Sequence, residues 1–277
     1  MVIQHNISAV NAYRNLNNNT TALNKNLEKL SSGYRINRAA DDAAGLAISE
    51  SMRSKIAGLD QSVSNANDGI GLIQTTEGAL SETHSMLQRL TTLATQAANG
   101  TYNSVARTNI QAEVDELAKE ITRIATSTSY NGIHMLTGKV STISGDGSHV
   151  KLQIGPTKDE WISIKPSKMT ASQLKVSGLN MKSVSGANSA ITKISTAINT
   201  VSKYRATLGA KQNRLEHTIN NLKVTSENVT SAESRIRDTD MASEMAAYTK
   251  NNVLVQAATS MLAQANQSGS SVLSLLQ

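Results

Sequence analysis

The sequence predicts a mainly α-helical protein: a long antiparallel helical hairpin or coiled-coil bundle with a small β-hairpin region in the middle of the chain. The first observation is a pair of seven-residue apolar tracks, because a heptad repeat places its residues on one helix face. The second is that no proline precedes Pro156 and none follows Pro166, so neither end is interrupted. The tracks are Leu59, Ala66, Ile73, Leu80, Leu87 and Ala94, and Ile194, Val201, Leu208, Leu215, Leu222 and Val229.

Composition supports this fold class. The 277 residues include no Phe and one Trp, so Ala, Leu, Ile, Val and Met must form the core, as in helical bundles. The net charge is +6, but the basic residues look dispersed along the chain and lack interleaved aromatics, so we expect no nucleic-acid partner. Cysteine is absent, which excludes disulfides and thiolate metal sites. No apolar run approaches the roughly 20 residues of a membrane span, so we expect no membrane insertion.

The first half of the chain is expected to hold three helices. Apolar spacing predicts a helix over about 3–32, and Gly33 follows as its C-terminal cap. After a short break, Asp41 or Asp42 is the N-cap of a second helix over about 43–98. Steps of four and three between Ile110 and Ile124 predict a third helix over about 104–128.

The second half mirrors the first after a change of period. Alternating apolar residues predict a β-hairpin region over about 133–175, with room for one extra short strand. Helical periodicity returns over about 186–232, a break follows near Glu233–Asp238, and a last helix begins near Met241. We therefore expect a discontinuous terminal domain (1–40 plus 236–277) and a helical rod domain (41–235).

The terminal helices carry apolar residues that a two-helix pair cannot fully cover. Val253, Leu254, Leu273 and Leu275 lie off the main tracks. Burial of one apolar seam stabilises two helices only slightly compared with the conformational entropy that they lose on ordering. We therefore expect both ends to be loosely ordered in the monomer and to fold on assembly. A head-to-tail contact that does not close generates a filament. The predicted self-assembly residues are Ile3, Ile7, Val10, Leu23, Leu27, Leu30, Met241, Tyr248, Val255, Leu262, Val272 and Leu276.

The two breaks are rich in charge, which permits two interpretations. Opposite charges at facing breaks could pair and fix the angle between the domains, or the same residues could be caps and solvated loop charges of little energetic worth. The residues concerned are Arg35, Arg38, Asp41 and Asp42 at the first break and Arg235, Arg237, Asp238 and Asp240 at the second.

Catalytic chemistry is not predicted. The five histidines are scattered, and none forms a metal-ligand pair at helical spacing. No nucleophile and base can be placed together from the sequence. We expect neither an enzyme nor a cofactor.

Four long stretches resemble the terminal regions of bacterial flagellin, the subunit of the flagellar filament. They are SSGYRINRAADDAAGLAISESMR at 31–53, SYNGIHMLTG at 129–138, SRIRDTDMASEM from Ser234, and NVLVQAATSMLAQANQSGSSVLSLLQ from Asn252. Their order and spacing match the family, and the resemblance covers about 1–138 and 186–277. Only about fifty residues separate the helical halves, so the chain resembles a minimal flagellin without the outer variable domains.

The resemblance implies a filament subunit that serves motility. The first and last helices would form the inner tube, with the long helices and hairpin as the next shell. Subunits of this family are exported unfolded by the flagellar type III route, without a cleaved signal peptide, and add at the distal tip. The implied partners are copies of the same chain, the export chaperone and export apparatus, the filament cap and hook-associated proteins. The implied location is extracellular.

The resemblance also implies two recognition sites. Some flagellins are detected by Toll-like receptor 5 through a Gln-Arg-x-Arg-x-Leu-x-x-Gln pattern, which Gln88, Arg89, Leu93 and Gln96 match. Thr91 stands where the pattern has its second Arg, and Glu113 matches a further contact position. In the C-terminal SVLSLLQ, an intracellular immune sensor or the export chaperone would engage Leu273, Leu275 and Leu276.

Two other functions stay open at this point. One is a hook–filament junction protein of the same system, which shares helical ends but departs from the AADDAAGLAISESMR and MLAQANQ runs. The other is a soluble coiled-coil adaptor or a membrane-active helical protein. Growth of filaments by the purified chain separates the first interpretation from these, and liposome leakage would favour the last.

Overall fold

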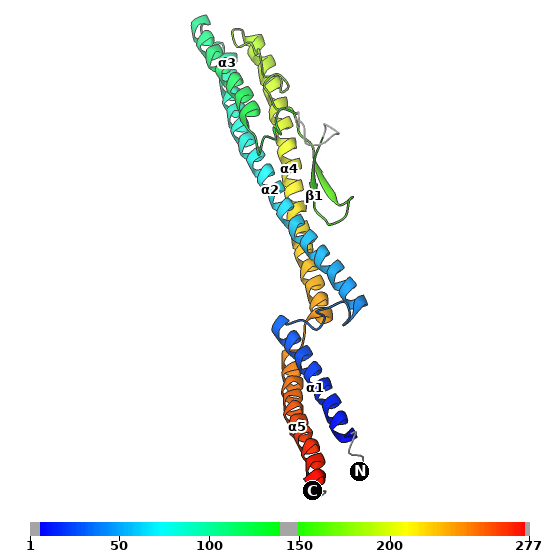
Figure 1. Cartoon of the computed structure of the whole chain (residues 1–277). Coiled ribbons are helices and arrows are strands. Elements are labelled where there is room, and N and C mark those ends of the chain that lie inside the picture. Colours follow the sequence, from blue (N-terminus) through cyan, green and yellow to red (C-terminus); the bar gives the residue numbers. More distant parts are fainter. Residues whose placement is uncertain (1–5, 139–148, 275–277) are drawn as a thin grey trace. The chain divides into compact units, whose positions relative to one another are not determined.

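The computed structural model describes residues 6–138 and 149–274, with side chains placed up to Gln267. Within these ranges the chain is mainly helical, with a two-stranded antiparallel sheet in the middle, which confirms the predicted fold class (Figure 1). The elements are α1 (Ile7–Ser32), α2 (Ala43–Ala98), α3 (Ser104–Ser127), β1 (Val150–Gln153), β2 (Trp161–Ile164), α4 (Val184–Arg237) and α5 (Met241–Ser274).

The chain divides into two compact units, and the divisions fall inside α2 and α4. One unit comprises residues 1–56 and 227–277, and the other comprises residues 57–226. The sequence places the domain boundaries near residues 40 and 236 instead, and that division stays a prediction. No helix in the described ranges is long and apolar enough to cross a bilayer.

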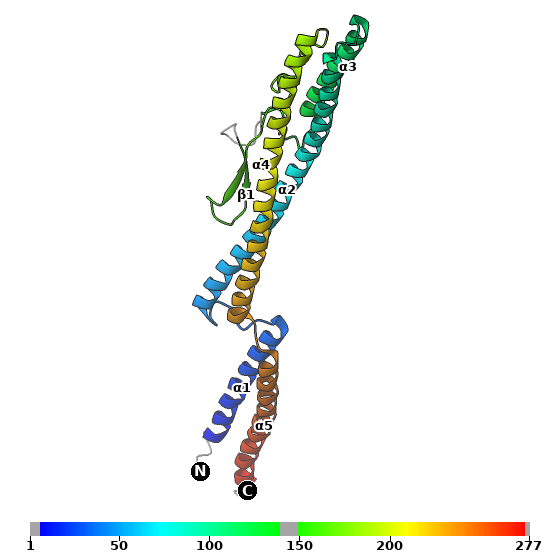
Figure 2. The ribbon, with the colours of Figure 1, turned by 180° about the vertical axis from the view of Figure 1, so that it is seen from behind.

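In the terminal unit, α1 and α5 run antiparallel, side by side in both views (Figures 1 and 2). Asn6 caps α1 by accepting the Ala9 N–H at 3.1 Å, and Gly33 ends it with φ 76°, a left-handed conformation that favours glycine. The sequence offered Asp41 or Asp42 as the N-cap of the second helix. The structure selects Asp42, because its Oδ1 accepts the Gly45 N–H at 2.9 Å.

The central unit has the core. Every residue of the Leu59–Ala94 track is at most 3% exposed, and the Ile194–Leu222 track is buried along its length. From α3, Ile110, Val114 and Ile121 complete the same core. The heptad prediction thus holds where three helices pack together, because each apolar stripe meets apolar neighbours on more than one side.

The hairpin is shorter than predicted, and the segment that follows it contributes more buried side chains to the core than the sequence indicated. β1 and β2 pair with Leu152 opposite Ile162, and the extra strand is not found in the described ranges; Thr137 and Lys168 make only an isolated bridge. The segment after β2 supplies buried side chains that the sequence analysis did not assign to the core. They are Met169, Ala171, Leu174, Val176, Leu179 and Met181.

One helix boundary differs from the prediction. The helix expected to end near residue 232 continues to Arg237, and the break is only residues 238–240. The added turn is stable because the Asp238 N–H bonds the Ser234 carbonyl at 2.9 Å and two arginines lie in the last turn, where positive charge favours the helix dipole. Asp240 then begins α5 by accepting the N–H groups of Ala242 and Ser243.

Candidate self-assembly site

The α1–α5 pair is poorly covered. No residue of α1 is buried, and along its length only one helix, α5, packs beside it. Of the residues predicted to form the inner core, Leu23, Leu30, Tyr248, Val255 and Leu262 lie half-buried. These five form the seam between the helices.

Other apolar side chains of the pair point away from the seam. Ile7 and Val10 are 67% and 66% exposed, and Leu27 and Met241 are about half exposed. Val253 and Leu254, which the sequence left without a partner, are indeed exposed. Tyr13, Met245 and Met261 add to the same exposed set. Because exposed apolar side chains gathered on one pair of helices can mark an interaction surface, the pair offers a candidate self-assembly site.

Some predicted assembly residues lie outside the described ranges. Ile3 and Leu276 belong to the ends that the structure does not describe, as does Leu275 of the tail site. Val272 and Leu273 lie within α5, but their side chains are not described.

Polar contacts hold the pair in register. The Asn6 side chain donates to the Ala265 carbonyl at 2.8 Å, near the free ends of the helices. At the opposite end, Lys29 Nζ lies 3.9 Å from Glu244 Oε2. Polar contacts therefore link α1 and α5 near both ends of the pair.

The two breaks meet through the backbone. Tyr34 and Asp238 form an isolated antiparallel bridge. The Arg35 N–H donates to the Arg237 carbonyl at 2.6 Å, and the Thr239 N–H donates to the Gly33 carbonyl at 2.9 Å. These bonds join the segment after α1 to the segment before α5 in a short ladder.

Of the two interpretations of the break charges, direct pairing of opposite charges between the breaks is not observed among the described residues. Among the ion pairs of the described residues, none links a break residue to a residue of the other break. Arg35 instead donates to the carbonyls of Ile236 (2.6 Å) and Arg235 (3.4 Å), because the last turn of a helix offers unpaired carbonyl groups. The Arg235 side chain is exposed.

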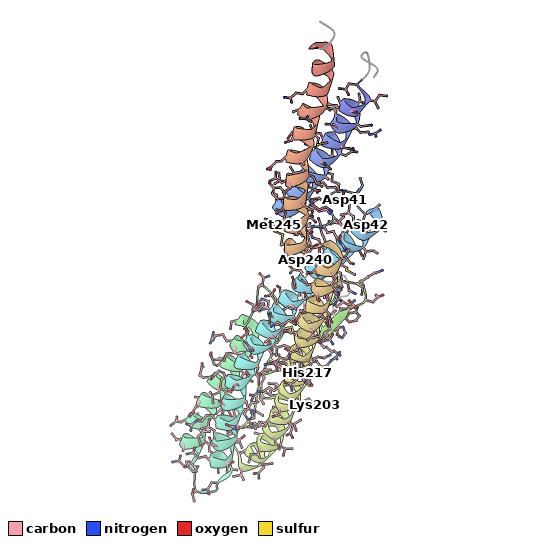
Figure 3. All side chains as sticks on the ribbon, turned by 90° about the horizontal axis from the view of Figure 1, so that it is seen from below. Asp41, Asp42, Lys203, His217, Asp240 and Met245 are labelled. Carbon is pink, nitrogen blue, oxygen red and sulfur yellow. The ribbon has the colours of Figure 1, made fainter. Side chains whose placement is uncertain are left out.

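The charged groups pair with nearby helices. Asp41 lies 2.8 Å from Lys25 Nζ and also accepts the Arg38 N–H, and these contacts lower the pKa of Asp41 to about 2. Arg38 pairs with Glu28 at 2.8 Å. Figure 3 labels Asp41 and Asp42 together with Asp240. The ion pairs of the first break therefore connect it to α1.

Arg237, at the end of α4, has the most buried side chain among the ion-paired residues near the two breaks, with 13% of it exposed. Its Nη1 donates to Glu50 at 2.6 Å, and this bond lowers the pKa of Glu50. Its guanidinium lies over the Tyr34 ring, 4.8 Å from the ring centre. Sequence analysis missed Glu50 and Tyr34 as partners, although both stand in the 31–53 stretch quoted above.

The second candidate surface follows α2 and α3 in the central unit. Arg89 Nε donates to Glu113 Oε1 at 2.8 Å, and both side chains are substantially exposed. Gln88 bonds His84 at 3.1 Å, and Gln96 donates to the Tyr102 hydroxyl at 2.7 Å. Leu93 is the exception among the five predicted receptor residues: it is 2% exposed and packs in the core, so its side chain has no surface to present.

The fold and these surfaces define a class: a structural protein of long paired helices whose first and last helices, α1 and α5, pack together and leave apolar faces uncovered. Nothing in the described ranges groups three His, Asp or Glu side chains closely enough to hold a metal ion.

Sequence comparisons identify the family. The bacterial flagellin N-terminal helical region matches residues 3–141, and the bacterial flagellin C-terminal helical region matches residues 191–276. The flagellar filament 33 kDa core protein of Treponema phagedenis is 49% identical over 286 residues, and the flagellin of Bacillus subtilis (strain 168) is 47% identical over 304 residues. Each alignment covers 100% of both chains. The chain therefore belongs to the bacterial flagellin family, a family of structural proteins rather than enzymes.

Solved structures agree with the fold. The crystal structure of Bacillus cereus flagellin is 33% identical, with a TM-score of 0.51, and the match covers 57% of this chain and 88% of that one. A putative flagellar hook-associated protein from Vibrio parahaemolyticus reaches a TM-score of 0.60 over 72% of this chain and 100% of that one. At 11% identity, the second likeness shows the fold alone.

Proposed function

We propose that this chain is a structural subunit of the bacterial flagellar filament. The observation that carries the proposal is the α1–α5 pair, whose outer apolar faces remain exposed although full-length relatives at nearly half identity include a flagellar filament core protein. A chain that functioned alone would gain nothing from this arrangement. Copies of the chain would cover the exposed faces.

The physical driving force is burial of those faces. Full burial of a Val, Leu, Ile or Met side chain contributes about 1.5–3 kcal/mol, and several such side chains are at least half exposed. Part of this gain offsets the entropy of ordering the helices, which is why the ends are expected to order as the polymer grows. Uniformly strong amide protection across both ends of a dilute monomer would contradict that coupling.

Electron microscopy of the purified chain tests the function directly. Full-length protein, seeded or salted out, should form long filaments, whereas a version trimmed to about residues 41–235 should not. Circular dichroism must first show that the trimmed chain is helical, so that loss of polymer reports the missing ends. Filaments from the trimmed chain would refute the role of the α1–α5 pair, and a folded full-length chain that never polymerises would refute the function.

The finer steps belong to the same proposal. The chain would leave the cell unfolded by the flagellar type III route, pass through the filament channel and add at the distal tip beneath the cap. The lack of cysteine supports unfolded passage, since no disulfide can form on the way. The export chaperone would hold the tail that includes Leu273, Leu275 and Leu276, and deleting residues 271–277 should abolish chaperone binding in a pull-down.

Recognition by Toll-like receptor 5 is proposed for the α2–α3 surface. Exposure of Arg89 and Glu113 supports it, because an arginine held at Nε by a carboxylate still presents its remaining N–H groups. R89A should weaken binding of the monomer to the receptor ectodomain about tenfold or more, which is typical of an arginine hot spot. R123A is the matched control, since Arg123 also pairs with a carboxylate but lies on α3, ten residues beyond Glu113. Equal loss in both variants would contradict a specific site.

A further inference from the structure

The positive charge of this chain is concentrated in one stretch of the central unit. Residues 149–182 include six lysines and only two acidic residues, so this stretch accounts for four of the six net positive charges. The lysines are Lys151, Lys158, Lys165, Lys168, Lys175 and Lys182. This stretch contains the hairpin and the buried segment that follows it.

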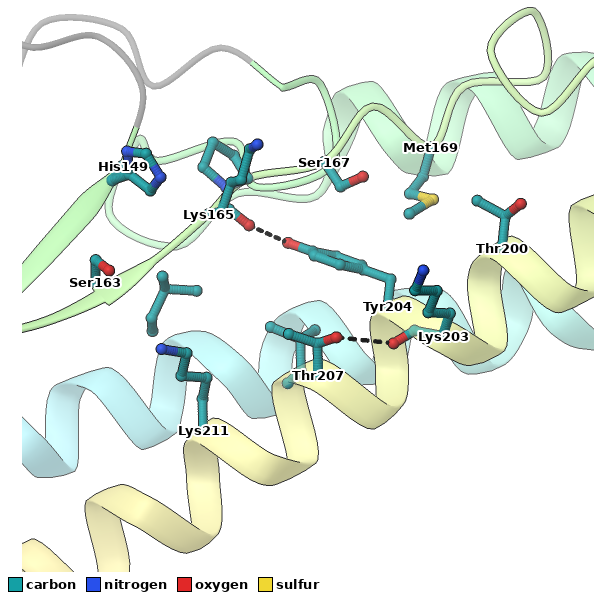
Figure 4. A pocket seen from close by; sticks show the side chains of 13 residues that line it. His149, Ser163, Lys165, Ser167, Met169, Thr200, Lys203, Tyr204, Thr207 and Lys211 are labelled. Carbon is teal, nitrogen blue, oxygen red and sulfur yellow. Dashed lines mark hydrogen bonds between the residues drawn. The ribbon is translucent and has the colours of Figure 1, made fainter.

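A cavity of about 430 Å³ lies between this basic stretch and α4 (Figure 4). Lys165 lines it after β2 with its backbone carbonyl turned toward Tyr204, and Lys203 and Lys211 line it from α4. Among the described residues, no aspartate or glutamate lines the cavity. None of the three lysine amino groups forms an ion pair with a described residue. The described lining therefore carries three lysines and no counterion for them.

The rest of the lining is rich in oxygen atoms above a covered apolar base. Ile164, Met169 and Leu208 form that base and are nearly fully buried, so they expose almost no surface to the cavity. The Tyr204 hydroxyl donates to the Lys165 carbonyl at 3.0 Å, and burial raises the pKa of this phenol to about 12. Tyr204 therefore stays neutral and keeps its oxygen free to accept.

Two threonine hydroxyls are fixed in the same way. Thr200 donates to the Thr196 carbonyl at 2.9 Å, and Thr207 donates to the Lys203 carbonyl at 2.9 Å. Because each hydroxyl already donates its hydrogen to a backbone carbonyl of α4, its oxygen can only accept a hydrogen bond from a ligand. The site thus combines cationic donors and neutral acceptors beside the ring of Tyr204.

This combination selects one ligand chemistry. A small inorganic anion such as sulfate would satisfy the lysines but has no hydroxyl groups to donate to the oxygens of Tyr204, Thr200 and Thr207, and an apolar ligand would offer neither charge nor donors. A sugar ring has hydroxyl groups that donate and a C–H face that packs on an aromatic ring, and an acidic substituent would meet the lysines. We propose that this cavity binds an acidic saccharide bearing a carboxylate or sulfate, either as a free sugar acid or as a unit of an acidic polysaccharide. Its volume lies within the range of small-ligand sites.

Titration calorimetry on the full-length monomer tests the proposal with four probes: glucuronate, a heparin hexasaccharide, glucose and sodium sulfate. Binding of glucuronate at least about tenfold tighter than glucose and sodium sulfate is expected, a difference of about 1.4 kcal/mol. The titration with the hexasaccharide distinguishes a free sugar acid from a unit of a polysaccharide. Binding of both acidic probes indicates a free sugar acid or a chain end, whereas binding of the hexasaccharide alone indicates an internal unit of a polysaccharide.

Paired lysine variants locate the site. K203A/K211A should lose about tenfold or more in affinity for the acidic probe, because each removed ammonium is a charge-assisted donor. K193A/K223A is the matched control, since both lysines are exposed on α4 and do not line the cavity. Equal losses in the two double variants would show diffuse attraction to a basic protein and overturn the proposal.

Other results would also overturn it. Absence of binding by the unaltered chain to either acidic probe would do so regardless of how the variants fold. Sulfate binding as tight as glucuronate would refute a saccharide site. Filament growth is expected to survive in K203A/K211A, which separates this site from the self-assembly surface. If growth is lost and no probe binds, the occupant is another copy of the chain.

Discussion

Two glycines of α2 allow the packing of the hairpin to be measured. Gly69 is buried beneath the hairpin, and a Cβ added there would collide with Leu152 Cδ1 of β1. Gly78 lies on the exposed side of the same helix, and a Cβ added there would meet nothing within 4 Å. G69A and G78A therefore change the same residue type in the same helix, with and without a neighbour.

The expected magnitudes follow from two opposing terms. Replacing glycine with alanine inside a helix stabilises it by about 1 kcal/mol. At Gly69 the new methyl group must also displace Leu152, while Leu215 at 3.4 Å limits the room nearby. Such overpacking costs typically about 1–3 kcal/mol. G78A should thus stabilise the protein by about 1 kcal/mol, and G69A should range from neutral to about 2 kcal/mol destabilised.

Urea unfolding followed by circular dichroism gives the free energies, and tryptophan fluorescence gives the location. Trp161, the single tryptophan of the chain, lies in β2 next to Ile162, the partner of Leu152. Its emission should change in G69A and remain unaltered in G78A. Adding L152A to G69A removes the collision and should return Gly69→Ala to a favourable effect relative to L152A alone. The reasoning is refuted if G69A stabilises the chain as much as G78A does.

Three further predictions concern the helical core, the first break and the backbone ladder. L80A should lower the free energy of unfolding by about 2–5 kcal/mol because Leu80 is fully buried, whereas V224A at an exposed position should change it by under about 0.5 kcal/mol; similar urea midpoints would contradict the core assignment. The pKa of Asp41 lies below its ordinary value of 3.8, so its stabilising contribution is complete above about pH 4 and is lost as the pH falls toward 2. In D41N this part of the pH dependence of the thermal midpoint should disappear, and an unchanged profile would exclude Asp41 as its source. R237Q should speed hydrogen–deuterium exchange of the Arg35 amide, which bonds the Arg237 carbonyl, and equal exchange rates would show that the backbone ladder holds without the guanidinium.

Local signals predicted the helices well. Residues 43–98 were predicted as one helix, and α2 has these bounds, because an aspartate cap begins it and an Asn-Gly pair follows it. The 104–128 helix was predicted to within one residue. Both results rest on information carried by neighbouring residues, which a sequence displays directly.

Features that depend on distant contacts were harder to predict. The last turn of α4 is held by Glu50 and Tyr34, which come from the other end of the chain, so its periodicity alone gave too short a helix. The buried segment after β2 has no regular period, and its apolar residues reveal their role only when they meet α3 and α4. The lysine surplus of residues 149–182 was visible in the sequence. Its meaning appears only once α4 places Lys203 and Lys211 opposite Lys165.

Apolar helix faces have opposite outcomes in the two units, and the number of packing partners explains why. The heptad track of α2 packs in one core with α3, α4 and the hairpin, so its residues are almost fully buried. The apolar face of α1 packs against α5, so none of its residues is buried and Ile7 and Val10 stay two-thirds exposed. A helix pair of this kind is marginal by itself, because a single seam barely offsets the entropy of ordering the chain. The partners that α1 and α5 lack within the chain are those that neighbouring copies would supply in the proposed filament. On this reasoning, stability of the ends should rise with polymer formation, while that of the central unit should not.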